Sequence, residues 1–137
     1  MRYSYACILL LTPTLVGCHS VTSRADPNWE ADLKRADAVV VRNLTAEQRL
    51  TDPDVIDRLA RIYEGARWEP YWHTLPGNLG DRTIDVFLGE AKLRHLSYTG
   101  LLWENERYDS NRTASLTESD REWLESLFDS IANEGAR

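Results

Sequence analysis

The chain has 137 residues, of which 22 are acidic and 16 are basic, and its formal net charge is −6. An acidic surface repels phosphate backbones and anionic headgroups, so this composition argues against nucleic acid as a partner. The length is sufficient for one domain with its own hydrophobic core.

An N-terminal apolar run ends in a cysteine. Arg2 precedes the run, its apolar residues lie at 6–11 and 15–16, and Pro13 interrupts it. A helix that spans a bilayer needs about 20 apolar residues, and this run is too short and too broken for that. The pattern is therefore typical of a signal peptide.

The end of the run, Leu15-Val16-Gly17-Cys18, resembles the lipobox of bacterial lipoprotein signal peptides. The resemblance implies that residues 1–17 are removed and that Cys18 carries a diacylglyceryl group, usually with an amide-linked third acyl chain. One chain alone binds a membrane weakly, whereas two or three make attachment effectively permanent. His19 stands where an Asp would signal inner-membrane retention. The resemblance thus implies a lipid-anchored protein of the cell envelope, at the outer membrane and facing the periplasm.

Two other interpretations of this segment are an uncleaved anchor and an ordinary secretory signal. The ordinary signal would lack its small-x-small cleavage site, because Leu15 would occupy position −3 before Cys18. A disulfide between Cys7 and Cys18 is a further alternative. It would bury both sulfurs in an apolar segment and close a loop that encloses no other part of the protein. If Cys7 is removed and Cys18 is lipidated, the remaining chain has no thiol and relies on its hydrophobic core.

The expected organisation is a signal peptide at 1–17, a lipidated polar tether at 18–28 and a single small domain at 29–137. Within the domain, 29–36 is ambiguous between a helical turn and an arm before a strand. The β-branched run at 38–41 predicts a strand. A helix is predicted after this strand, with Asp52 as its N-cap, Pro53 in its first turn and an apolar stripe that ends at Gly65.

The second half of the domain predicts a sheet followed by a last helix. Alternating apolar residues predict strands at 83–88 and 91–103, with a tight reversal at Gly89-Glu90 and a bulge at Gly100, and a further strand at 112–116. Thr117 and Asp120 form a capping-box-like start for the last helix. We expect an α+β fold, an antiparallel sheet of about four strands with two helices packed on one face.

The most aromatic stretch follows the first helix and contains Trp68, Tyr71, Trp72 and His73. Tryptophan and tyrosine bring large contact area at low entropic cost, so these four residues are the candidate binding surface. The alternative is structural, with the rings covering the sheet edge and sealing the core. The loop at 75–81 lacks the lysine and helix of a phosphate loop, so nucleotide binding is not indicated.

Residue patterns for catalysis or metal binding are absent from the sequence. His73 and His95 have no recognisable nucleophile or metal-pair spacing, and a Glu104 and Glu106 pair at a hairpin end is typical of solvated residues. Asp52 and its acidic neighbours lack the spacing and glycine of a calcium loop. We therefore expect no catalytic residue, no metal ion and no cofactor.

The sequence favours a membrane-anchored, non-enzymatic binding or accessory module, with the lipid on Cys18 as its membrane contact and an envelope protein or glycan as its partner. One alternative is an immunity protein or enzyme inhibitor, because an acidic surface can plug a basic active site. A second alternative is a minor periplasmic hydrolase that uses His73 or His95 with nearby carboxylates.

Overall fold

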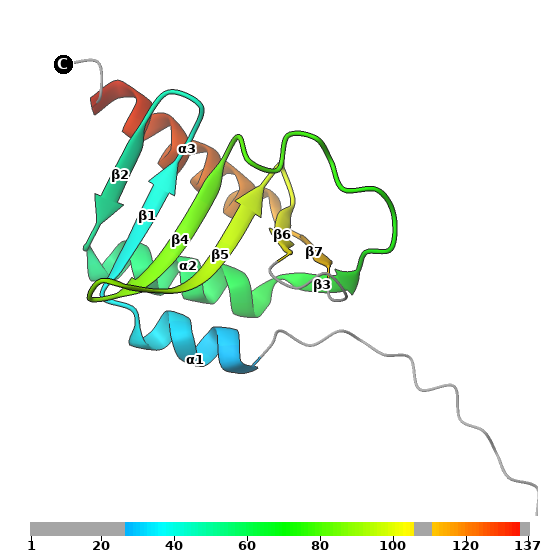
Figure 1. Ribbon diagram of the computed structural model, residues 1–137, viewed down its shortest axis with the longest axis horizontal. Helices are drawn as coiled ribbons and strands as arrows, with labels where there is room; N and C mark the ends of the chain where they lie inside the picture. The colour runs from blue at the N-terminus through cyan, green and yellow to red at the C-terminus, as the bar shows by residue number, and fades with distance from the viewer. Residues whose placement is uncertain (1–26, 106–110, 135–137) are drawn as a thin grey trace, which may run out of the picture.

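One antiparallel sheet with helices on one face forms the part of the chain that the computed structural model describes, residues 27–105 and 111–134 (Figure 1). Within these residues the sheet has seven strands in the order β2-β1-β4-β5-β6-β7-β3. The strands are β1 (Ala38–Arg42), β2 (Glu47–Leu50), β3 (Arg67–Pro70), β4 (Thr83–Leu88), β5 (Ala91–Tyr98), β6 (Leu102–Glu104) and β7 (Arg112–Ser115). The helices are α1 (Pro27–Arg35), α2 (Pro53–Gly65) and α3 (Glu118–Glu134).

The hydrophobic core lies between the sheet and the helices. Every second strand residue faces it, because successive side chains of a strand point to opposite faces. The sheet contributes Val39, Ile84 and Leu96, among others, to this core. Leu59 of α2 and Phe128 of α3 pack against them from the helix side. The apolar side chains whose spacing predicted the strands and the helices therefore pack together in one buried layer.

The starts of the two long helices confirm the expected capping. The Asp52 side chain accepts a hydrogen bond from the Asp54 N–H at 2.9 Å, and Pro53 occupies the first turn of α2. At α3 the Thr117 hydroxyl donates to the Asp120 carboxylate at 2.7 Å and accepts from the Asp120 N–H at 3.2 Å. These side chains satisfy backbone donors that the first helical turn leaves without partners.

Residues 29–35 of the ambiguous segment belong to a helix. Helix α1 begins at Pro27, two residues before the expected domain boundary, and packs beside α2 with Leu33 fully buried. Asp32 accepts a hydrogen bond from Arg94 of β5 at 2.7 Å and also pairs with Arg35. Burial raises the pKa of Asp32, but the hydrogen bonds and charges of the two arginines outweigh it and lower the pKa below its usual value. The carboxylate stays ionised at neutral pH and ties α1 to the sheet.

The expected α+β class, the antiparallel sheet and the packing of helices on one face are confirmed, but the expected numbers of strands and helices are too low. The short edge strands β2 and β3 were not predicted, because they have few buried side chains and owe their order to pairing with a neighbour. The expected strand at 91–103 is two strands. The chain turns at Gly100, whose φ is +91°, and the Thr99 N–H donates to the Leu101 carbonyl at 3.0 Å.

The reversal at Gly89-Glu90 is confirmed, since Leu88 pairs with Ala91 and Gly89 has a φ of +60°. The bulge expected at Gly100 is instead in the β4–β5 pair, where the register shifts between Val86 and Phe87. Phe87 pairs with Lys92 and Val86 pairs with Arg94, which leaves Leu93 as the extra residue. None of the helices within 27–105 and 111–134 is long and apolar enough to cross a membrane.

Replacement of Leu59 tests the buried layer. We expect Leu59→Ala to lower the free energy of unfolding by about 2–5 kcal/mol, because Leu59 is fully buried and its loss leaves a cavity. Leu44→Ala is the matched control, since 78% of Leu44 is exposed, and should change stability by less than about 0.5 kcal/mol. Urea unfolding followed by circular dichroism measures both, and equal losses would contradict this assignment of the core.

Candidate functional site

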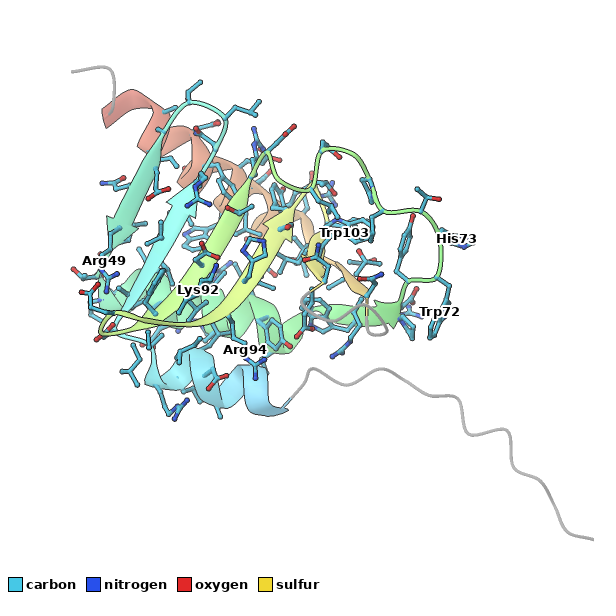
Figure 2. The ribbon with its side chains drawn as sticks, in the orientation of Figure 1. Arg49, Trp72, His73, Lys92, Arg94 and Trp103 are labelled. Atoms are coloured by element: carbon cyan, nitrogen blue, oxygen red, sulfur yellow. The ribbon has the colours of Figure 1, made fainter. Side chains whose placement is uncertain are left out.

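The face of the sheet that points away from the helices is the candidate functional site, and we call it the open face (Figure 1). Arg42 lies on β1, Arg49 on β2, and Lys92 and His95 on β5, and we call these four residues the cationic half. The connection between β3 and β4 meets the other end of this face at Trp103 of β6. Figure 2 shows Arg49 and Lys92 in the left half of the view and Trp72 and His73 at its right end.

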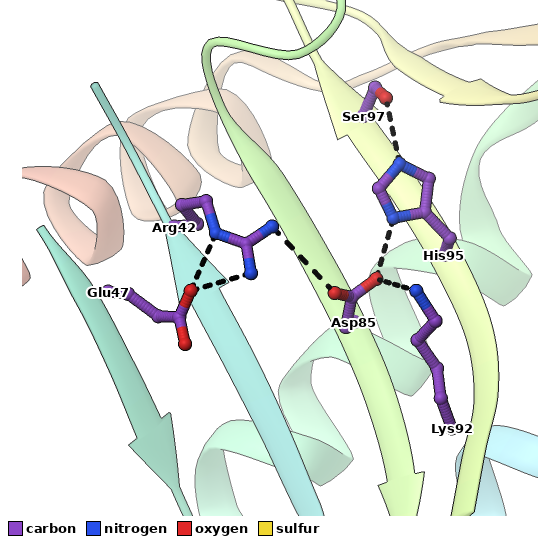
Figure 3. Close-up of polar contacts among 6 residues, drawn as sticks. All are labelled: Arg42, Glu47, Asp85, Lys92, His95 and Ser97. Atoms are coloured by element: carbon purple, nitrogen blue, oxygen red, sulfur yellow. Dashed lines mark hydrogen bonds and ion pairs between the residues drawn. The ribbon is translucent and has the colours of Figure 1, made fainter.

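Asp85 is the centre of the cationic half (Figure 3). The β4–β5 register places it opposite His95, whose Nδ1 lies 2.6 Å from Oδ1 of Asp85. Nζ of Lys92 lies 3.5 Å from the same oxygen, and Nη1 of Arg42 lies 4.0 Å from Oδ2. The residue is only 6% exposed because these side chains surround it. A buried carboxylate of this kind needs such partners, since its charge is otherwise costly to desolvate.

The arginines of the cationic half are held in place by further contacts. Nε of Arg42 donates to Oε2 of Glu47 at 2.7 Å, across the β1–β2 pair. Arg49 donates to the Gly89 carbonyl at 2.7 Å, and its guanidinium lies over the Phe87 ring at 5.0 Å. Side chains that are already ordered lose less entropy when a partner binds.

Asp85, His95 and Ser97 lie in the order of a catalytic serine triad. Oγ of Ser97 is 3.5 Å from Nε2 of His95, which is longer than an ordinary hydrogen bond between these atom types. Ser97 is 2% exposed, and it pairs with Thr83 on one side and Trp103 on the other. An acyl substrate cannot reach a hydroxyl that is enclosed in this way. The contacts among Asp85, His95 and Ser97 therefore orient the His95 ring. They do not provide an accessible nucleophile.

The aromatic residues predicted as a binding surface divide between the core and the exterior. Trp68 is 1% exposed, its indole N–H donates to the Tyr63 carbonyl at 3.0 Å, and its ring packs on Tyr63, so it is not part of any exposed surface. This corrects the expectation for Trp68. The reason is that Trp68 lies on β3, where alternation turns its side chain toward the helices.

The other three predicted residues lie together on the β3–β4 connection. Tyr71 packs edge-on against Trp103 with ring centroids 4.8 Å apart, and His73 contacts Tyr71 at 5.5 Å. Trp72 is 79% exposed. We call Tyr71, Trp72, His73 and Trp103 the aromatic half. It continues the open face beyond the cationic half, because Trp103 pairs with Ser97, which neighbours His95.

His95 lies against a carboxylate, that of Asp85, but the other residues that the sequence suggested for catalysis do not join it in one site. His95 lies in the cationic half beside Asp85, whereas His73 lies on the β3–β4 connection beside Tyr71. Glu104 faces the helices, 3.5 Å from the Tyr63 hydroxyl and 3.5 Å from Arg112, and Glu106 lies outside the described residues. Cys18 also lies outside them. Within the described ranges, no three histidine, cysteine or acidic side chains are grouped closely enough to hold a metal ion.

Sequence reasoning missed Arg42, Arg49, Asp85 and Lys92. Their signal was present as the polar positions that alternate with apolar ones on neighbouring strands. Which polar positions meet depends on strand order and register, and neither follows from the pattern of a single strand. Comparison of the chain with protein-family models, with curated proteins and with solved structures finds no match.

Replacement of Asp85 tests its central role. We expect Asp85→Asn to reduce the free energy of unfolding by about 1–3 kcal/mol, because Lys92 loses the carboxylate that compensates its charge and the His95 ring loses its carboxylate hydrogen-bond partner. Glu47→Gln removes a carboxylate that is 55% exposed and should cost less than about 1 kcal/mol. Both are measured by urea unfolding at neutral pH. Equal effects of the two substitutions would show that Asp85 is an ordinary surface charge.

Proposed function

We propose that this protein is a lipid-anchored envelope protein that acts as a non-enzymatic binding module, and that its open face binds a partner with acidic surface groups. The observation that carries this proposal is the cationic half, which is ordered and partly exposed in a chain whose net charge is −6. Within the described residues the helices pack on the opposite face of the sheet, and none of them covers the open face (Figure 1).

Charge complementarity supports an acidic partner. The side chains of Arg42, Arg49 and Lys92 carry three positive charges, and those of Glu47 and Asp85 carry two negative charges, so positive charge is in excess among these residues. Electrostatic complementarity selects partners and speeds their association. Trp72 would add apolar contact area at the other end of the open face, since exposed tryptophans are frequent binding hot spots.

Attachment to the membrane is proposed to occur through acyl chains on Cys18. The polar residues 19–26 would then separate the lipid from α1 and keep the domain close to the membrane. A short tether raises the local concentration of the domain near partners in the same membrane.

Replacement of Cys18 tests the anchor. We expect cells that express the full chain to incorporate a fatty-acid analogue into it, and the Cys18→Ser variant to lose the label because serine offers no thiol for the diacylglyceryl group. Gel fluorescence and membrane fractionation measure both. Cys7→Ser is the matched control and should keep the label. Equal labelling of the wild type and Cys18→Ser would contradict the anchor.

Charge reversal on the open face tests the binding module. We expect the full chain, captured from envelopes after crosslinking, to retain a defined partner that the Arg42→Glu/Lys92→Glu variant loses, because reversal of both charges replaces attraction by repulsion. Arg61→Glu on the exposed side of α2 is the charge-matched control and should retain the partner. Trp72→Ala should weaken capture about ten-fold if the aromatic half contributes. Equal capture by all variants would exclude the open face.

The inhibitor or immunity alternative has support from a different surface. Four acidic residues of α3, Glu118, Glu122, Glu125 and Asp129, line a shallow depression together with Arg121 and Ser126. Like charges four residues apart destabilise a helix slightly, so this acidic row costs some stability. A Glu122→Lys variant belongs in the same capture experiment. Loss of the partner in this variant alone would favour a basic partner bound by α3.

A further inference from the structure

A cavity of about 450 Å³ lies at the end of the sheet opposite the Gly89-Glu90 turn, and we call it the end cavity. The β1–β2 hairpin, the β3–β4 connection, the β5–β6 turn and α3 all contribute to its wall. Its polar lining includes Asn43, Asn78, Asp81, Arg82, Tyr98 and Glu125. The volume is within the range of small-molecule sites.

One wall of the end cavity is rigid. The Tyr98 hydroxyl donates to Oε1 of Glu125 at 2.9 Å, and Arg82 forms an ion pair with the other oxygen of that carboxylate. The Tyr98 ring stacks on Phe128 at 5.5 Å, and the Arg82 guanidinium lies 5.7 Å from the same ring. Burial, together with the hydrogen bond to Glu125, raises the pKa of Tyr98, so its hydroxyl stays protonated at neutral pH.

The β1–β2 hairpin side of the cavity is also ordered. The Asn43 side chain donates to the Phe128 carbonyl at 2.8 Å and accepts from the Ala46 N–H at 2.8 Å. These contacts fix the hairpin to α3 and leave Leu44 as an exposed apolar residue at the rim. The cavity therefore has its shape before a ligand arrives, which lowers the entropic cost of binding.

Asn78 and Asp81 are the side chains of the lining that remain available to a ligand. Their backbones form a turn in which the Asp81 N–H donates to the Asn78 carbonyl at 3.1 Å. Within the described part of the chain, neither side chain has a hydrogen-bond or ion-pair partner. Asp81 offers two acceptor oxygens, and Asn78 offers both a donor and an acceptor.

We infer that the end cavity binds a neutral, polyhydroxylated ligand, a sugar unit of a glycan. A hydroxyl both donates and accepts, so adjacent hydroxyls match the acceptors of Asp81 and the mixed amide of Asn78. Arg82 is already compensated by Glu125, and the additional carboxylate of Asp81 makes the lining unfavourable for anions. Leu44 at the rim offers an apolar contact for the C–H face of a sugar ring. This site is separate from the open face and does not depend on the function proposed for it.

Titration of the full chain in detergent with N-acetylglucosamine, and in parallel with glucose, tests the inference. Glucosamine and glucuronate are the cationic and anionic comparators. Isothermal titration calorimetry and saturation-transfer NMR should show saturable binding of at least one neutral sugar, with glucuronate several-fold weaker. Binding of glucosamine alone would overturn the inference in favour of a cationic ligand, and absence of saturable binding by either neutral sugar would overturn it outright.

Variants locate the binding. Asp81→Asn keeps the shape of the side chain but removes its charge, and Asn78→Ala removes the amide, so each should weaken sugar binding about ten-fold or more. Glu90→Gln in the turn at the other end of the sheet is the matched control and should bind as the wild type does. Thermal unfolding of each variant establishes that it is folded. Unchanged affinity in both cavity variants would place the sugar elsewhere and overturn the assignment.

Discussion

The β4–β5 pairing, with its extra residue at Leu93, is the constraint on which both faces of the sheet depend. A two-residue reversal at Gly89-Glu90 without a bulge would set Asp85 opposite Arg94. The register shift sets it opposite His95 instead, because one additional residue moves the following side chains to the other face. Arg94 therefore reaches Asp32 on the helix side, and His95 reaches Asp85 on the open face.

These two contacts give the sheet different chemistry on its two faces. On the helix side, the Arg94–Asp32 pair holds α1 against a layer of buried apolar side chains. On the other side, the same hairpin places Lys92 and His95 around a buried carboxylate, and β1 adds Arg42. A small acidic domain thereby presents a locally cationic surface. Charge at this local scale, more than the net charge of the chain, determines which partners suit it.

The connection between β3 and β4 links the two proposed sites. Tyr71 near its start packs on Trp103 and extends the open face, while Asn78 and Asp81 near its end line the end cavity. Long connections without regular structure are frequently functional. In this chain the connection is held at its start by the hydrogen bond from the Tyr71 N–H to the Asn111 carbonyl. It exposes Trp72 near that end and Asn78 near the other.

The sequence by itself determined the α+β class, the main strands and the starts of the two capped helices, because these depend on local periodicity and on side chains within one helical turn of each other. It also carries the lipobox-like tetrapeptide, whose meaning depends on four adjacent residues. Tertiary structure decided what Trp68 and Asp85 do. Trp68 belongs to a short edge strand that is ordered by its neighbour, and Asp85 acquires its partners through a register shift. Strand pairing joins residues distant in the chain, so the hydrophobic pattern of a single strand does not specify which side chains will meet.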